Sequence, residues 1–117
     1  RDEGFSLEFA SARALAALRE RGDVAVYAIV GDDYWLLEAG DLPRRSAAPA
    51  SYYRMHEDTL PATMDRAART LPRGAEVTWA VTLPAAVAGD IEQIMSRAQG
   101  GALVIGADGS VTLEDRE

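Results

Sequence analysis

Residues 24–38 read VAVYAIVGDDYWLLE, and this stretch decides the class of the fold. β-branched and aromatic residues dominate on both sides of Gly31-Asp32-Asp33, a group of residues typical of turns. Two such runs separated by a short turn predict a β-hairpin formed by residues 24–30 and 34–38. The neighbouring segments show which elements accompany this hairpin.

The segment before the hairpin predicts a helix. Its alanines and leucines form an apolar stripe after Ser11, a suitable N-cap, and Gly22 is suited to end the helix. Further upstream, Phe5, Leu7 and Phe9 alternate with polar residues, which predicts a short strand. The same stretch is also compatible with the first turn of the helix.

The segment after residue 58 predicts two helices with a strand between them. Apolar residues at helical spacing predict one helix that begins at Asp58 or Thr59 and another between Pro84 and Gly100. Residues 77–83 alternate bulky and small side chains, as a strand does. The apolar positions are Leu60, Met64, Ala67, Ala68 and Leu71 in the first helix and Val87, Ile91, Ile94, Met95 and Ala98 in the second.

A second hairpin ends the chain, because residues 102–105 and 111–113 flank the turn Gly106-Ala107-Asp108-Gly109. The order is then (β)αββ, a long loop, and αβαββ. One mixed sheet with about three helices on one face buries all of these apolar stripes. We therefore predict an α+β fold, a two-layer sandwich, with residues 1–117 as a single compact domain. Since the chain begins at Arg1, we expect it to be a fragment of a larger or processed protein.

The composition excludes several classes of function. Among 117 residues, 12 arginines stand against 19 aspartates and glutamates, and the net charge of −7 has the wrong sign for binding nucleic acid or an anionic membrane. The absence of cysteine excludes disulfides, cysteine-based zinc sites and iron–sulfur clusters. No run approaches the roughly 18 apolar residues of a membrane span. A high alanine content with neither asparagine nor lysine is typical of a GC-rich bacterial genome.

No motif for catalysis stands out. His56 is the single histidine, so a histidine-dependent general base must use it, and sites with several histidines are excluded. Glu57 and Asp58 follow it, but adjacent side chains point in different directions and do not form a ready ligand set. No serine lies in a Gly-x-Ser-x-Gly elbow, and no glycine pattern indicates a phosphate site. We therefore expect no cofactor and no metal.

The long connection over residues 40–58 concentrates arginine, tyrosine and methionine, which are enriched at binding surfaces. Two other interpretations carry similar weight: a loop packed over a sheet edge, or an additional edge strand over residues 52–55. Our hypothesis is a non-enzymatic protein-interaction module that binds a protein partner through residues 44–56 of this loop or through an exposed sheet edge. The alternative is a small-ligand-binding domain or an enzyme that uses His56. The residues expected to contact the partner are Arg44, Arg45, Tyr52, Tyr53, Arg54 and His56.

From residue 24 onward, the order hairpin, helix, strand, helix, strand resembles that of periplasmic domains of the TolR and ExbD type. Members of that type are anchored by a single membrane span and act as dimers in energy-transducing complexes. The resemblance implies the soluble part of a membrane-anchored component of the cell envelope, an extracytoplasmic location and a homodimer.

Overall fold

The structure, a computed structural model, describes residues 4–38, 40–55, 64–72 and 74–114. They form an α+β fold, as the sequence predicts, and the chain divides into two compact units. Unit 1 contains residues 1–24 and 83–117, and unit 2 contains residues 25–82. In chain order the elements are β1 (Phe5–Phe9), α1 (Arg13–Arg21), β2 (Ala25–Val30), β3 (Asp33–Leu37), β4 (Arg44–Ser46), β5 (Tyr53–Arg54), α2 (Asp65–Arg69), β6 (Val77–Thr82), α3 (Ala85–Arg97), β7 (Gly101–Ile105) and β8 (Val111–Glu114).

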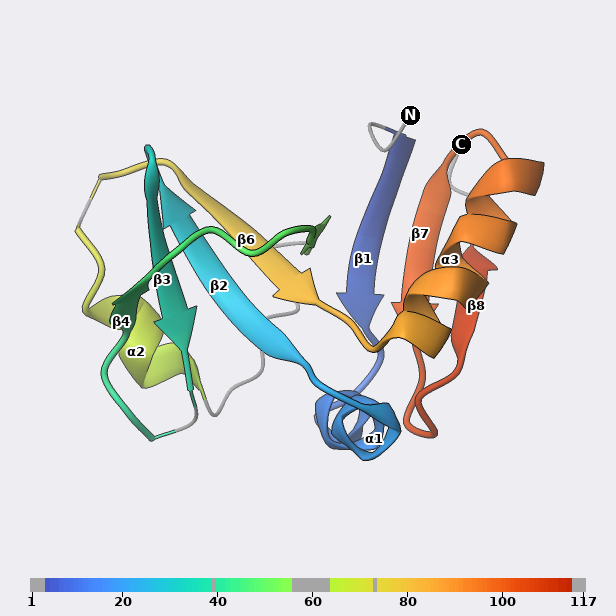
Figure 1. The fold of residues 1–117 in the computed structure, drawn as a ribbon, viewed down its shortest axis with the longest axis horizontal. Helices are drawn as coiled ribbons and strands as arrows, with labels where there is room; N and C mark the ends of the chain where they lie inside the picture. Colours follow the sequence, from blue (N-terminus) through green and yellow to red (C-terminus); the bar gives the residue numbers. More distant parts are fainter. Residues whose placement is uncertain (1–3, 39, 56–63, 73, 115–117) are drawn as a thin grey trace. The chain divides into compact units, whose positions relative to one another are not determined.

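Unit 1 contains a three-stranded mixed sheet in the order β1-β7-β8 (Figure 1). β1 runs parallel to β7 with Leu7 opposite Leu103, and β8 runs antiparallel to β7. Since neighbours in register share a face, the odd-numbered residues of β1 and β7 form one apolar face. The apolar stripes of the two helices are buried as well. The buried helical residues are Ala14, Leu15 and Leu18 of α1 and Val87, Ile91 and Met95 of α3.

Arg21 joins three elements of unit 1. Its Nη1 donates a hydrogen bond of 2.8 Å to the backbone oxygen of Gly109, in the turn between β7 and β8. Its Nη2 lies 3.6 Å from a carboxylate oxygen of Asp90 on α3. The end of α1 is therefore fixed to the turn and to the second helix by one partly buried side chain.

Two glycines allow the chain to pass close to itself beside the β1–β7 pair. A Cβ atom on Gly100 would lie 2.6 Å from the backbone oxygen of Gly4, and a Cβ atom on Gly4 would lie 2.5 Å from the backbone oxygen of Gln99. Real Cβ atoms do not come this close to backbone oxygens. The first register pair, Phe5 with Gly101, therefore requires that residues 4 and 100 have no Cβ atom.

Unit 2 contains a five-stranded antiparallel sheet in the order β4-β3-β2-β6-β5. Ala28 at its centre is fully buried and lies between two tryptophans, because it pairs with Trp35 on one side and Trp79 on the other. A small side chain between two large ones allows the indole rings to share this face. The same face carries the buried residues Val26, Leu37, Met55 and Val81, and the buried residues Met64, Ala67 and Leu71 of the α2 segment complete the core of unit 2.

Unit 2 is an insertion between α1 and α3 of unit 1. Its first and last residues, Ala25 and Thr82, are partners in the β2–β6 pair. The backbone N–H of Ala25 also donates a hydrogen bond of 3.0 Å to the hydroxyl of Thr82. The chain thus enters and leaves unit 2 through two adjacent strand ends.

The order of helices and strands agrees with the sequence prediction, and residues 5–9 form a strand. Two details differ. The strands divide between two sheets, because β1 and β7 pair with each other in parallel while the first hairpin pairs with β6. The long connection also contains two short strands, β4 and β5, the second at the place of the edge strand considered above. The predicted start of the second helix and Leu60 lie outside the described residues, and one domain over residues 1–117 stays a prediction.

Candidate functional site

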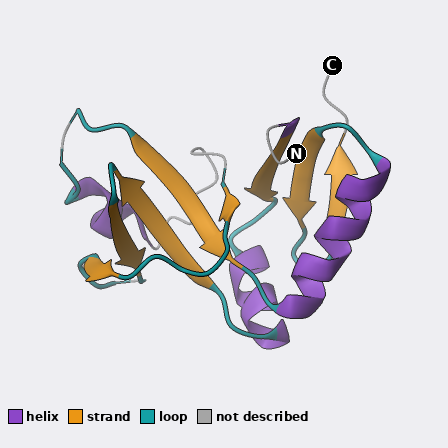
Figure 2. Ribbon diagram, turned by 45° about the horizontal axis from the view of Figure 1, so that its top comes forward, coloured by secondary structure: helices purple, strands orange, loops and turns teal. Residues whose placement is uncertain are grey.

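The long connection crosses one face of the five-stranded sheet. β4 lies at one edge of that sheet and β5 at the other, so residues 47–52 must run from edge to edge. We call these six residues the strap. Figures 1 and 2 show the strap in front of β3, β2 and β6. Its sequence, AAPASY, contains small side chains until Tyr52.

The sheet face beneath the strap is aromatic and only partly buried. The ring of Tyr52 meets the ring of Tyr34 edge to face, with centroids 6.4 Å apart and planes at 67°. By register, Ile29 pairs with Tyr34 and Tyr27 pairs with Leu36, so these four half-buried residues share the strap face. Burial raises the pKa of Tyr34, and the neighbouring Tyr52 raises it further through its charge and a side-chain hydrogen bond.

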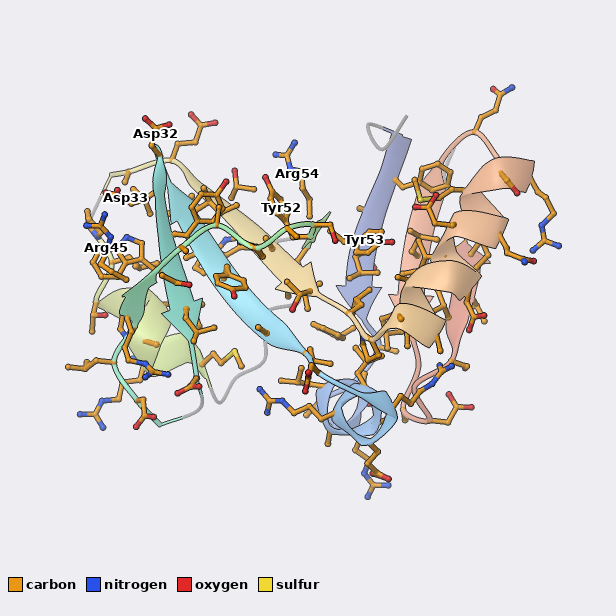
Figure 3. The ribbon with its side chains drawn as sticks, in the orientation of Figure 1. Asp32, Asp33, Arg45, Tyr52, Tyr53 and Arg54 are labelled. Carbon is orange, nitrogen blue, oxygen red and sulfur yellow. The ribbon has the colours of Figure 1, made fainter. Side chains whose placement is uncertain are left out.

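The two arginines of β4 lie on opposite faces of the sheet, because they are adjacent residues of one strand. Arg44 is on the strap face, where it donates a hydrogen bond of 3.1 Å to Glu38. Arg45 is on the other face, where it donates a hydrogen bond of 2.8 Å to Asp33 (Figure 3). The guanidinium of Arg45 also lies 5.3 Å from the ring centroid of Trp35. These ion pairs are exposed, so water and salt weaken them.

Tyr53 and Arg54 of β5 also point to opposite faces. Tyr53 pairs with Val81 and is half-buried on the face of the tryptophans, whereas Arg54 pairs with Ala80 on the strap face. Arg54 is exposed, and it forms no ion pair within the described part of the chain. The structure therefore brings Arg44, Tyr52 and Arg54 to one face and separates Arg45 and Tyr53 from them.

The same connection carries an apolar residue that sequence reasoning missed. Among the described residues, the large hydrophobic side chains that are exposed are Leu42, at 62%, and Tyr52, at 37%. Leu42 lies between Asp41 and Pro43, outside any helical or strand pattern. A leucine without a periodic neighbour was the signal that it does not belong to the core.

The remaining sequence predictions concern chemistry. His56 lies outside the described residues. Within the described ranges, no group of three or more histidine, cysteine, aspartate or glutamate side chains is arranged to hold a metal ion. None of the described helices is long and apolar enough to cross a membrane.

No protein-family model, curated protein or solved structure matches the chain. No match supports the likeness to TolR and ExbD domains, which rests on the order of elements in the sequence alone.

Proposed function

We propose that the chain is a protein-interaction module that binds a protein partner through the strap and the residues beside it. The supporting observation is that both exposed large hydrophobic side chains of the described chain, Leu42 and Tyr52, belong to this one connection. An exposed tyrosine between arginines is the composition of binding hot spots.

Charge supports the same surface. Residues 42–55 contain three arginines and no acidic residue, in a chain with a net charge of −7. Arg44 and Arg54 flank the strap face at its two edges, and Tyr52 lies on that face between them. A partner on this face meets one aromatic ring and two cations. Arg44 forms an exposed ion pair with Glu38, whereas Arg54 forms none with the residues that the structure describes.

A photo-crosslinking amino acid at position 52 tests the proposal, with position 19 as the matched control. Arg19 is exposed on α1 and belongs to unit 1, whereas the strap belongs to unit 2. We expect irradiation in extract of the source cells to give a discrete protein adduct from position 52 and none from position 19.

Binding of the captured protein is then measured with purified variants. We expect the double variant Tyr52→Ala/Arg54→Ala to weaken its affinity by about tenfold or more, and Arg19→Ala to leave it unchanged. Equal adducts from both positions, or an unchanged affinity of the double variant, would refute the proposal.

A further inference from the structure

β1 is an unusual edge strand. It is at one edge of the three-stranded sheet, and it is the longest of the four edge strands of the two described sheets. Proteins protect such edges with positive charge, proline, bulges or short length. β4 carries two arginines and β5 has two residues. In contrast, β1 has the sequence FSLEF, with no positive charge, no proline and no bulge, and its one charged residue is Glu8.

The outer edge of β1 presents the backbone groups of its odd-numbered residues. The backbone N–H of Ala10 donates to Ile105 of β7, and in a parallel pair alternate residues bond to the same neighbour. Ser6 and Glu8 therefore direct their backbone groups to β7. Phe5, Leu7 and Phe9 direct theirs away from it.

The sequence of β1 is complementary to itself in the antiparallel direction. When two copies of FSLEF are paired about a two-fold axis at Leu7, Phe5 of one copy lies opposite Phe9 of the other. Ser6 then lies opposite Glu8, so like charges do not meet. The three outward-directed residues fall into hydrogen-bonded pairs, each of which exchanges two backbone hydrogen bonds.

We propose that two copies of the chain associate through their β1 edges, which joins two three-stranded sheets into one continuous sheet. The occupant of the edge is a second copy because an isologous contact requires a self-complementary surface, and this strand has one. Phe5 and Phe9 are half-buried in one copy, so their pairing covers further apolar surface. An edge of five residues is short, and the dimer is therefore weak, with a dissociation constant in the micromolar to millimolar range.

A pair of substitutions at one position gives opposite expectations. In the dimer, residue 6 of each copy lies opposite Glu8 of the other copy. Ser6→Glu therefore places two carboxylates opposite each other in both of these pairs, and Ser6→Arg places a guanidinium opposite a carboxylate in both. We expect the first to raise and the second to lower the dissociation constant of the dimer, each by about threefold to thirtyfold, in sedimentation equilibrium.

Ser96 provides the matched control. It is exposed on α3, outside β1, and Ser96→Glu and Ser96→Arg change the net charge of the chain by the same amounts. We expect both Ser96 variants to associate like the parent chain. Equal effects at positions 6 and 96, effects of one sign for both Ser6 variants, or a parent chain that stays monomeric at millimolar concentration would overturn the proposal.

Amide hydrogen exchange of the parent chain tests the register without any substitution. The amide of Glu8 is directed to β7 and is protected at every protein concentration. We expect the protection of the Leu7 and Phe9 amides to rise with concentration. Protection of these two amides that is already complete in dilute solution means that the chain itself covers this edge, and that result also overturns the proposal.

Discussion

Replacing Gly100 by alanine tests the close approach between Gly4, just before β1, and the segment that joins α3 to β7. The added Cβ would lie 2.6 Å from the backbone oxygen of Gly4, so β1 and the segment before β7 must separate by several tenths of an ångström. The contact is with a backbone atom, which cannot move aside as the end of a flexible side chain can. Overpacking of this kind costs about 1–3 kcal/mol, while the loss of glycine freedom in the unfolded chain returns about 0.4–1 kcal/mol. We therefore expect a net loss of about 1–2 kcal/mol in the free energy of unfolding.

Gly89 supplies a matched control within the same unit. It lies inside α3, is exposed, and a Cβ atom there would meet nothing within 4 Å. Alanine has the higher helix propensity, so Gly89→Ala is expected to stabilise unit 1 by about 1 kcal/mol. For a chain of this length each kcal/mol moves the melting temperature by about 3–5 °C.

Thermal and urea unfolding, followed by the circular dichroism of each variant, measure both changes. We expect melting temperatures on opposite sides of the parent value. Gly100→Ala at or above the parent melting temperature would refute the close approach, and a fall for Gly89→Ala would show that the helix around it is placed differently.

Three further predictions concern single side chains. Arg21→Met loses the hydrogen bond to Gly109 and the ion pair to Asp90, and we expect unfolding in urea to show a loss of about 1–2 kcal/mol, with Arg19→Ala within about 0.5 kcal/mol of the parent. Ala28→Leu crowds a fully buried site between Trp35 and Trp79, and it is expected to cost about 1–3 kcal/mol; an unchanged stability would contradict this placement. The hydroxyl and the backbone N–H of Ser110 donate hydrogen bonds to Asp108 and lower its pKa, so the ionised carboxylate stabilises the folded state. This stabilisation is fully present above the pKa of Asp108 in the unfolded chain, and it is lost as the pH falls through the lower pKa of the folded state. NMR titration should show a higher pKa for Asp108 in Ser110→Ala, and an unchanged value would exclude the side-chain hydrogen bond as the main cause.

Much of the fold follows from local patterns in the sequence. Alternation at Phe5, Leu7 and Phe9 and helical spacing at Val87, Ile91 and Met95 predict both the element and its buried side, because side-chain direction repeats with a fixed period. The alternation of side chains within a strand does not determine which other strand it pairs with. The pairing of Leu7 with Leu103 joins distant parts of the chain, and no local signal separates it from a pairing with the first hairpin. The division into two sheets therefore had to come from the structure.

The candidate site was predictable only in part. The composition of the long connection indicates a surface segment, and Tyr52 and Arg54 are exposed there. The path of the strap across the sheet could not be predicted, because its alanines and proline do not alternate between apolar and polar residues. Composition also could not separate Arg44 from Arg45, because only the register with β3 places them on opposite faces.

The insertion of unit 2 gives that unit a part in the folding of its host. Before unit 2 folds, a flexible loop of about 60 residues connects α1 to α3, and this loop must be closed when unit 1 folds. Once Ala25 and Thr82 are paired, the same closure spans only a few residues. Loop entropy changes by about 0.6 kcal/mol for each doubling of length, so the folded insert lowers the entropic cost of assembling unit 1 by about 2 kcal/mol. A mutation in the core of unit 2 is thus expected to weaken unit 1 without touching any of its residues.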